Sequence, residues 1–316
     1  MTTTVTTPPA SDSFVHPALF YSTQDEYLRE VGGFVRAAVE AGEPAFVAVP
    51  GDKLGPLRDA LGDAAAAVDF ADMTVLGRNP GRILSALQGF ADRSAGRAAR
   101  IVGEPIWPAR TSAEMLEATR HEALINTAFA RRTATILCPY FVPGLPEQVI
   151  ADARRTHPTL IVDGQDHLSD AYADAAVVCG DCDQPLPLPP DDALTVLYTT
   201  GGLADVRDRV IGWATRTALT PGRAGDLVLA VSEATTNSLR HGGGSGTLRL
   251  WKTSDGTVIA EISDAGHLRD PLSGRSRPAL SSANGGRGLW MIHQLSDLVE
   301  IRATSTGLTL RLHLTA

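Results

Sequence analysis

Apolar and polar residues follow one pattern in the first half of this 316-residue chain and another in the second half. In the first half, short apolar runs that are typical of buried strands alternate with segments that carry apolar residues at helical spacing. The expected strands are 18–21, 44–49, 73–76, 99–102, 135–137 and 159–162, and the expected helices are 24–41, 53–61, 80–95, 111–130 and 146–155. Strands that alternate with helices predict an α/β fold with a mostly parallel sheet and helices on both faces.

The second half places helices before most of its strands. We expect helices at 204–218 and 226–241, and strands at 194–199, 247–252, 258–263, 298–303 and 308–314. Pro221 marks a break before the second helix, and Asp255 with Gly256 is a typical hairpin turn between two of the strands. This pattern predicts an α/β sandwich with an antiparallel sheet and helices on one face.

A Pro-rich run at 184–190 lies between these two halves of the chain. We interpret 179–193 as a stiff, extended linker between a first domain at 14–178 and a second at 194–316. The length suffices for two domains that each have a core. Residues 1–13 are rich in Thr, Pro and Ser and lack a basic start and an apolar core, so we expect a disordered tail and not a signal peptide.

Composition narrows the class of protein. A hydrophobic content of 43% and a charged content of 20% describe an ordinary globular protein. The net charge of −8, without a basic block, argues against direct nucleic-acid binding. No apolar run approaches the roughly 20 residues that span a bilayer, so we expect no membrane association. Three cysteines are too few for a disulfide framework, which favours the reducing cytoplasm.

Cys179 and Cys182 form a Cys-x-x-Cys pair inside the expected linker. Such a pair binds zinc only with two more ligands nearby, and no second cysteine pair exists in the chain. We therefore expect both cysteines to have no function.

Candidate chemistry begins with Glu233 and Asn237, which lie four residues apart in the expected helix 226–241. This spacing puts both side chains on one face, one turn apart. A glutamate so placed can take a proton from a nucleophile, and the oxygen of a carboxamide suits Mg²⁺. The pair alone is a weak signal, because its spacing arises by chance on many exposed helices.

Two later patches strengthen this interpretation. Asp264 and Gly266 end an apolar run, and a polar stretch at 267–284 separates them from a glycine box at 285–288, which opens an apolar helix at 289–295. These three patches, in this order, resemble the Bergerat (GHKL) ATP-binding fold. The short polar stretch and the Gly-Arg-Gly-Leu-Trp helix resemble most the anti-sigma factor serine kinase branch. The resemblance covers about the last third of the chain.

The resemblance implies a site for ATP with Mg²⁺. Asp264 is expected to accept a hydrogen bond from the adenine amino group, and Gly266 to let the backbone approach the ring. Backbone amides of the glycine box are expected to face the phosphates, with a further contact from Arg287. The glycines of this box are Gly285, Gly286 and Gly288.

It also implies that Asn237 holds Mg²⁺ and that Glu233 activates the acceptor serine of a partner. One residue departs from the family pattern: a second glycine often follows the first by two residues, and here that position is Leu268. The departure leaves the catalytic rate open.

The first half resembles a second family. The residues that carry the resemblance are Gly103 to Pro105 with Trp107, Glu122 with Asn126, Cys138 to Tyr140, and Thr156 to Pro158. They are similar to those of the MEDS sensory domain, which implies a RecA-like sheet and a small, hydrocarbon-derived ligand. Each of Trp107, Cys138, Tyr140 and His157 is by itself better interpreted as part of a core or a loop. As a set we expect them to line a pocket.

Three other patterns are set aside. The stretch 50–54 lies where a phosphate-binding loop belongs, yet Lys53 is followed by Leu54 and the Gly-Lys-Ser/Thr pattern is missing, so we interpret it as a degenerate loop. Glu122 and Asn126 have the same spacing as Glu233 and Asn237, but no glycine box follows them, so we do not assign them to ATP binding. His121 beside Glu122 resembles a phosphoacceptor, but the chain around it lacks the two long helices of such a hairpin.

The leading hypothesis is a cytoplasmic anti-sigma regulatory factor. It would be an ATP- and Mg²⁺-dependent serine/threonine kinase that acts on a STAS-type anti-sigma antagonist, with a sigma factor as second partner and a small-ligand sensory domain. The alternative is a non-catalytic ATP-binding module that sequesters a sigma factor or other partner. A histidine kinase fragment ranks lowest for want of a phosphoacceptor hairpin. A homodimer stays open, because no sequence feature tests it.

Overall fold

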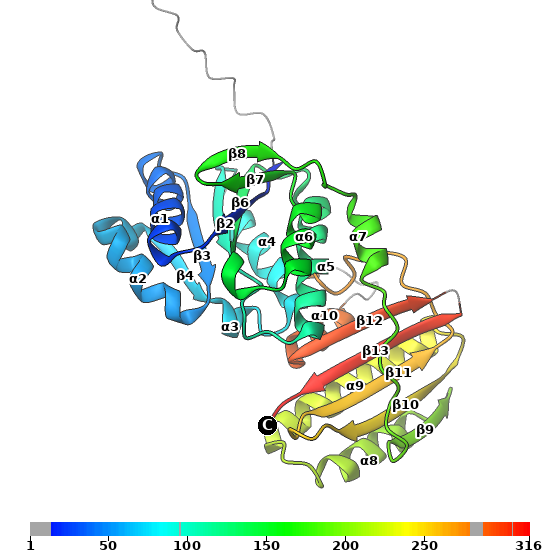
Figure 1. The fold of residues 1–316 in the computed structure, drawn as a ribbon. Coiled ribbons are helices and arrows are strands. Elements are labelled where there is room, and N and C mark those ends of the chain that lie inside the picture. Colours follow the sequence, from blue (N-terminus) through cyan, green and yellow to red (C-terminus); the bar gives the residue numbers. More distant parts are fainter. Residues whose placement is uncertain (1–13, 95, 279–286, 305) are drawn as a thin grey trace, which may run out of the picture. The chain divides into compact units, whose positions relative to one another are not determined.

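The computed structural model describes residues 14–94, 96–278, 287–304 and 306–316 (Figure 1). The chain separates into two compact units. The first unit comprises Met1–Val75, Leu87–Ala109 and Ile125–Ala175, and the second comprises Leu76–Ala86, Arg110–Leu124 and Ala176–Ala316. The tail expected at 1–13 lies outside the described residues, and the domain limits 14–178 and 194–316 stay a prediction.

A mostly parallel sheet forms the core of the first unit. Its strands are β1 (Phe14–Val15), β2 (Pro17–Tyr21), β3 (Ala45–Val49), β4 (Val68–Asp72), β5 (Ala99–Gly103), β6 (Ala134–Phe141), β7 (Thr159–Val162) and β8 (Gln165–Leu168). Their order is β4-β3-β5-β6-β2-β7-β8, with β1 also paired to β6. Among the described pairings, the one between β7 and β8 is antiparallel and the others are parallel. The predicted sheet is therefore confirmed.

Helices lie between these strands, and one more follows the last strand. They are α1 (Gln24–Glu40), α2 (Gly51–Leu61), α3 (Met73–Leu76), α4 (Ile83–Arg93), α5 (Ser112–Phe129), α6 (Glu147–Thr156) and α7 (Ala175–Asp181), with 3-10 turns at Gly62–Ala67, Pro80–Arg82 and Val142–Gly144. The first helix shows why the pattern was readable: Thr23 caps it by accepting a hydrogen bond from the Glu26 amide (3.2 Å), and Gly42 follows its end with φ of 69°. Between these signals its apolar face is buried.

The strand predicted at 73–76 is wrong, because these residues form helix α3 and the strand lies just before them as β4. Two aspartates hid β4 from the apolar pattern. One of them, Asp72, accepts a hydrogen bond from the Thr74 amide (2.8 Å), and this bond supports the turn that begins α3. Strand β8 and helix α7 were not predicted; β8 is exposed along its whole length and so carries no apolar signal.

The second unit is the predicted sandwich. Strands β9 (Leu194–Thr199), β10 (Ser245–Lys252), β11 (Val258–Asp264), β12 (Leu298–Thr304) and β13 (Gly307–Leu314) pair antiparallel in the order β12-β13-β11-β10-β9. Helices α8 (Leu203–Ala214), α9 (Pro221–His241) and α10 (Arg287–Leu295) share one apolar core with these strands. Pro221 is the first residue of α9, which therefore begins five residues before the predicted start. The first turn tolerates proline because its amides need no helical partner.

The Pro-rich segment crosses this sheet on the face away from α9 (Figure 1). Arg302 donates a hydrogen bond from Nε to the carbonyl of Gln184 (2.9 Å), and Arg311 donates from Nη2 to the carbonyl of Pro187 (2.6 Å). Cys179 lies in α7 and Cys182 follows it, and both are buried. The segment expected to be a linker thus begins within a helix and is bonded to the sheet.

Two shorter segments of the second unit carry buried polar contacts. Asn79 donates a hydrogen bond to the carbonyl of His293 (3.0 Å). Glu117 pairs with Arg302 (2.6 Å) and Arg275 (3.1 Å), and all three of these charged side chains are at most 5% exposed. Charges so deeply buried need partners, so this cluster is a fixed feature of the unit.

None of the helices in the described ranges combines the length and the apolar character that crossing a bilayer requires.

Candidate nucleotide-binding site

Helix α9 presents Glu233 and Asn237 on the side away from its buried stripe. Leu227, Val231 and Ala234 are buried against the sheet, whereas Glu233 and Asn237 are half-buried. The one-turn spacing of this carboxylate and carboxamide, predicted from the sequence, therefore places both at the edge of the helix layer.

A cavity of about 220 Å³ lies between α9, the end of β11 and the start of α10. Four of the predicted site residues line it, namely Asn237, Asp264, Gly266 and Gly288. The other lining residues are Ala234, Ser238, His241, Gly242, Ile262, His267, Leu268, Ser273, Leu289, Ile301, Leu308 and Leu310. Residues from three separate patches of the sequence thus meet around one space.

Gly288 sits where no larger residue fits without movement. A Cβ atom built there would lie 2.8 Å from Oε2 of Glu233 and 3.1 Å from Nδ2 of Asn237. Glu233 is not among the lining residues, but this close approach places its carboxylate beside the first turn of α10. The side chains of the expected base and the expected metal ligand therefore both lie close to the backbone of Gly288.

The turn after β11 is held by Asp264. Its Oδ1 accepts a hydrogen bond from the Gly266 amide (2.7 Å), and a Cβ atom at Gly266 would lie only 2.9 Å from the carbonyl oxygen of His241. Glycine is therefore required for the backbone to pass this close to α9. A carboxylate has about four acceptor positions, so Asp264 keeps capacity to accept from a ligand in the cavity.

Tyr198 links the sheet to helix α9 next to this site. Its hydroxyl donates a hydrogen bond to Oγ of Ser238 (2.8 Å), which joins β9 to α9. Burial raises the pKa of Tyr198 to about 12, so the hydroxyl stays protonated and keeps donating near neutral pH.

The remaining predicted residues have different places. Gly285 and Gly286 lie outside the described residues. Arg287 is the exposed first residue of α10 and is not among the residues that line the cavity. Leu308 and Leu310 of β13 form a wall that the sequence analysis missed, although their alternation along a strand was an available signal.

A second cavity, of about 470 Å³, lies within the first unit. It is lined by Tyr21, Gln24, Tyr27, Leu28, Pro50, Asp52, Lys53, Pro56, Trp107, Pro108, Ala109 and Phe141. Tyr21 and Phe141 end strands β2 and β6, and Pro50 follows β3. The cavity is thus at the carboxyl ends of parallel strands, where open α/β sheets bind ligands.

Lys53 carries the charge of this second cavity. Its ammonium group pairs with the carboxylate of Glu104, which is fully buried, and donates a hydrogen bond to the Tyr21 hydroxyl. That hydroxyl in turn donates to Glu104 (3.1 Å). The ammonium nitrogen also lies 5.1 Å from the ring centres of Tyr21 and Tyr27, within the range of a cation–π contact.

Burial raises the pKa of Glu104 from its ordinary value of 4.5 to about 7, against the opposing effect of Lys53. Residues 51–54 form the first turn of α2 and not a loop, and Lys53 supplies a charged group to this cavity. That the stretch is a degenerate phosphate-binding site stays an interpretation.

The pocket predicted from four residues of the first half is also corrected. Trp107 lines the second cavity, whereas Cys138, Tyr140 and His157 are buried and are not among its lining residues.

Comparison with known protein families gives one match in each half of the chain. Residues 15–158 match the family model of the MEDS domain, the methanogen/methylotroph DcmR sensory domain. Residues 199–314 match the model of the histidine kinase-like ATPase domain. No curated protein matches the sequence.

Among solved structures, the RsbU and RsbW domains of Rv1364c from Mycobacterium tuberculosis match at 20% identity and a TM-score of 0.29, over 39% of this chain and 32% of that one. The SiaB-SiaC complex from Pseudomonas aeruginosa matches at 14% identity and a TM-score of 0.30, over 39% of this chain and 89% of that one. The histidine kinase domain from Erythrobacter litoralis EL346 blue-light activated histidine kinase matches at 14% identity and a TM-score of 0.25, over 66% of this chain and 89% of that one. At these TM-scores the likeness carries no conclusion about function.

The two family matches support the MEDS and ATPase resemblances found in the sequence: residues 15–158 are similar to the MEDS sensory domain, and residues 199–314 are similar to the histidine kinase-like ATPase domain that follows it in the same chain.

Proposed function

We propose that the chain is a cytoplasmic anti-sigma regulator whose second unit binds ATP with Mg²⁺ and phosphorylates a serine of a STAS-type anti-sigma antagonist. The observation that carries the proposal is the convergence of Asn237, Asp264, Gly266 and Gly288 on one cavity, with Glu233 against Gly288. The match to a histidine kinase-like ATPase model supports ATP as the ligand.

The residues present suit this ligand. Asp264 and Gly266 line the cavity side by side, and Asp264 would accept a hydrogen bond from the adenine amino group. The amides at the start of α10 would face the phosphates, since helix N-termini favour anions. Asn237 would hold Mg²⁺ through its side-chain oxygen, and Mg²⁺ would neutralise phosphate charge.

Glu233 would accept the proton of the attacking serine hydroxyl. It is half-buried and beside the first turn of α10, so a serine that reaches the phosphates also reaches this carboxylate. The protein would have two partners, the antagonist and a sigma factor. It would bind the sigma factor when the antagonist is phosphorylated.

A kinase assay tests the proposal. Full-length protein, radiolabelled ATP and Mg²⁺ would be incubated with candidate STAS-type antagonists, and ATP affinity would be measured separately by calorimetry. Glu233→Ala should abolish phosphate transfer while ATP affinity changes little. Asp208→Ala, which removes an exposed carboxylate on α8, is the matched control and should transfer normally. Normal transfer by Glu233→Ala would remove the assigned role, and failure of the wild type to bind ATP would refute the whole proposal.

Leu268 favours one alternative. It lines the cavity and packs against the core at a position where the family often has glycine. A side chain anchored in this way would restrict the segment that closes over a nucleotide. The chain would then be a non-catalytic ATP-binding module that sequesters a sigma factor or other partner. ATP binding and partner capture without any transfer, in the same assay, would select this alternative.

The first unit would sense a small molecule in the second cavity. Its lining is mainly aromatic and aliphatic, with the ammonium group of Lys53 as a polar anchor, which suits a small apolar molecule that carries one acceptor group. Mass spectrometry of small molecules that co-purify with the full chain would identify it. The molecule should be lost from Trp107→Ala and retained by Tyr172→Ala, which alters an exposed tyrosine elsewhere in this unit. Equal recovery from both variants would place the ligand outside this cavity.

A further inference from the structure

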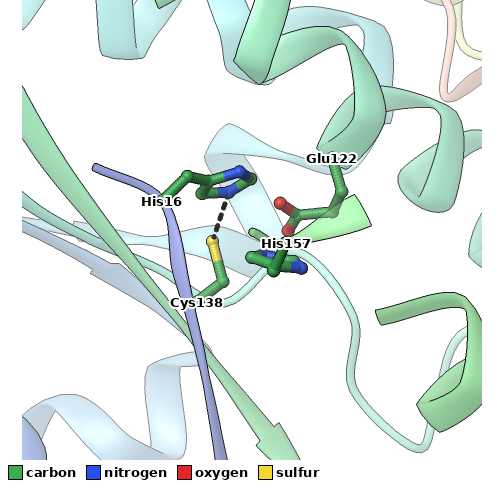
Figure 2. Close-up of side chains that lie close together, drawn as sticks. All are labelled: His16, Glu122, Cys138 and His157. Atoms are coloured by element: carbon green, nitrogen blue, oxygen red, sulfur yellow. Dashed lines mark hydrogen bonds between the residues drawn. The ribbon is translucent and has the colours of Figure 1, made fainter. Parts of the chain in front are cut away.

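Four buried side chains with metal-binding atoms gather in a part of the chain that neither cavity uses (Figure 2). They are His16, Glu122, Cys138 and His157, and each is at most 1% exposed. One ligand atom from each residue can be chosen so that all four lie within 4.8 Å of one another. We call this set the His/Cys cluster.

The sheet of the first unit positions three of these residues. His16 lies in the gap between β1 and β2, and both strands pair in parallel with β6, on which Cys138 aligns with Ala18. His157 caps the end of α6, just before β7. Glu122 is on α5, one turn before Asn126, and this helix is continuous from Ser112 to Phe129.

Asn126 sets the tautomer of His16. Its Nδ2 donates to the carbonyl of Thr156 (2.7 Å), so its Oδ1 is the atom 3.0 Å from Nδ1 of His16. An amide oxygen accepts only, so Nδ1 of His16 must carry the proton. The lone pair of the other ring nitrogen, Nε2, therefore faces Sγ of Cys138 at 3.4 Å.

His157 is oriented in the same way. Its Nδ1 lies 2.8 Å from the backbone carbonyl of Ala153, which also accepts the His157 amide (3.2 Å). The carbonyl has no proton to give, so this Nδ1 is protonated and the Nε2 atom keeps its lone pair. Both imidazoles thus donate their Nδ1 proton to an oxygen and keep Nε2 for coordination, as metal-bound histidines do.

Charge and distance fit a divalent transition metal ion. With two neutral imidazoles, a thiolate and a carboxylate, an M²⁺ ion gives a cluster without net charge, which lowers the energetic penalty of burying a thiolate and a carboxylate. Tetrahedral bonds of about 2.3 Å to sulfur and about 2.05 Å to nitrogen put these ligand atoms roughly 3.5 Å apart. The distance between Sγ of Cys138 and Nε2 of His16 is 3.4 Å.

We propose that His16, Glu122, Cys138 and His157 form a binding site for one divalent transition metal ion of the zinc class. Sulfur and imidazole ligands favour such ions over Mg²⁺ and Ca²⁺. Binding replaces the thiol S–H bond with an S–metal bond and releases the proton to solvent. Four buried protein ligands describe a closed, structural site that ties the β1–β2 junction to β6, α5 and α6. This proposal is independent of the proposed kinase activity.

Metal titration of the tag-free full chain tests the site. The protein would be purified, stripped with a chelator under reducing conditions, and titrated separately with Zn²⁺, Co²⁺ and Mg²⁺. We expect about one equivalent of Zn²⁺ or Co²⁺ and none of Mg²⁺ at this site. The Co²⁺ form should show a thiolate-to-cobalt charge-transfer band in the near ultraviolet, and Zn²⁺ should raise the melting temperature.

Cys138→Ser should lose the charge-transfer band, and His157→Gln should lower metal affinity at least tenfold. Cys179→Ser is the matched control, because it removes another buried thiol and should keep both the band and the stoichiometry. A folded wild type that binds no Zn²⁺ or Co²⁺ would overturn the proposal and leave a hydrogen-bonded polar cluster. Should the variants not fold, the wild-type spectrum still decides, since Co²⁺ bound without a thiolate band excludes Cys138 as a ligand.

Discussion

Replacing Glu104 with glutamine tests the charge arrangement beside the cavity of the first unit. Glu104 is fully buried, pairs with Lys53 and accepts a hydrogen bond from Tyr21. Glutamine keeps nearly the same shape and still offers an oxygen to the Tyr21 hydroxyl. The side chain of Lys53 is 22% exposed, so water can solvate its ammonium group when the carboxylate is gone. The substitution should therefore leave the fold intact.

Its effect on stability should depend on pH. The pKa of Glu104 rises from 4.5 to about 7 in the folded chain, and this difference corresponds to roughly 3 kcal/mol. Because the folded state binds the proton more tightly, this stability is complete below about pH 4.5 and is lost as pH rises through about 7. Between about pH 5 and about pH 8 the wild type should lose roughly 2–3 kcal/mol of stability relative to Glu104→Gln.

Native-state hydrogen exchange of amides in β3 and β5 would measure this difference, because it reports on the first unit alone. Glu40→Gln, which removes an exposed carboxylate on α1, controls for the loss of one negative charge. A stability difference that stays constant over this pH range would refute the reasoning. A wild type that gains stability relative to Glu104→Gln at high pH would show that pairing with Lys53 outweighs burial.

Three further predictions concern the second unit. Gly288→Ala should displace the Glu233 carboxylate and lower phosphate transfer by about 10²-fold in the kinase assay, with the fold retained because the clash is with the end of a flexible side chain. Asp264→Asn should weaken ATP binding by about 1.5–3 kcal/mol in calorimetry, while its side-chain oxygen still accepts from the Gly266 amide. Glu117→Gln should destabilise the chain by about 3–5 kcal/mol in thermal unfolding, because it removes the carboxylate that pairs with the buried Arg275 and leaves Arg302 with Glu300 only; an unchanged melting temperature would contradict this.

The sequence was most informative where one local signal decides the structure. Continuous apolar runs predicted β2 and β3, which are buried on both faces, and capping residues marked the ends of α1. The order of the three patches around Glu233, Asp264 and Gly288 predicted that they converge, and all three meet at the cavity of the second unit or beside it. The roles of these residues in catalysis and binding stay predictions.

Local signals failed where a neighbour in space decides the role of a residue. Lys53 and Glu104 are 51 positions apart, and each alone is an ordinary polar residue after a strand. They meet because β3 and β5 are adjacent in the sheet, an order that no local pattern encodes. Strand β4 was misplaced for a related reason: it is an edge strand with one buried residue, so its aspartates concealed it.

The length of β2 separates His16 of the His/Cys cluster from the cavity beside Lys53. His16 precedes β2, and Tyr21 ends it at the Lys53 cavity, so the two residues are five positions apart on one extended strand. At about 3.3 Å per residue they lie roughly 16 Å apart. A metal ion in the His/Cys cluster would therefore be at the opposite end of β2 from a ligand beside Lys53 and would not touch it. The cluster would hold the amino ends of β2 and β7 in place, while the carboxyl ends of β2, β3 and β6 remain available to shape the cavity.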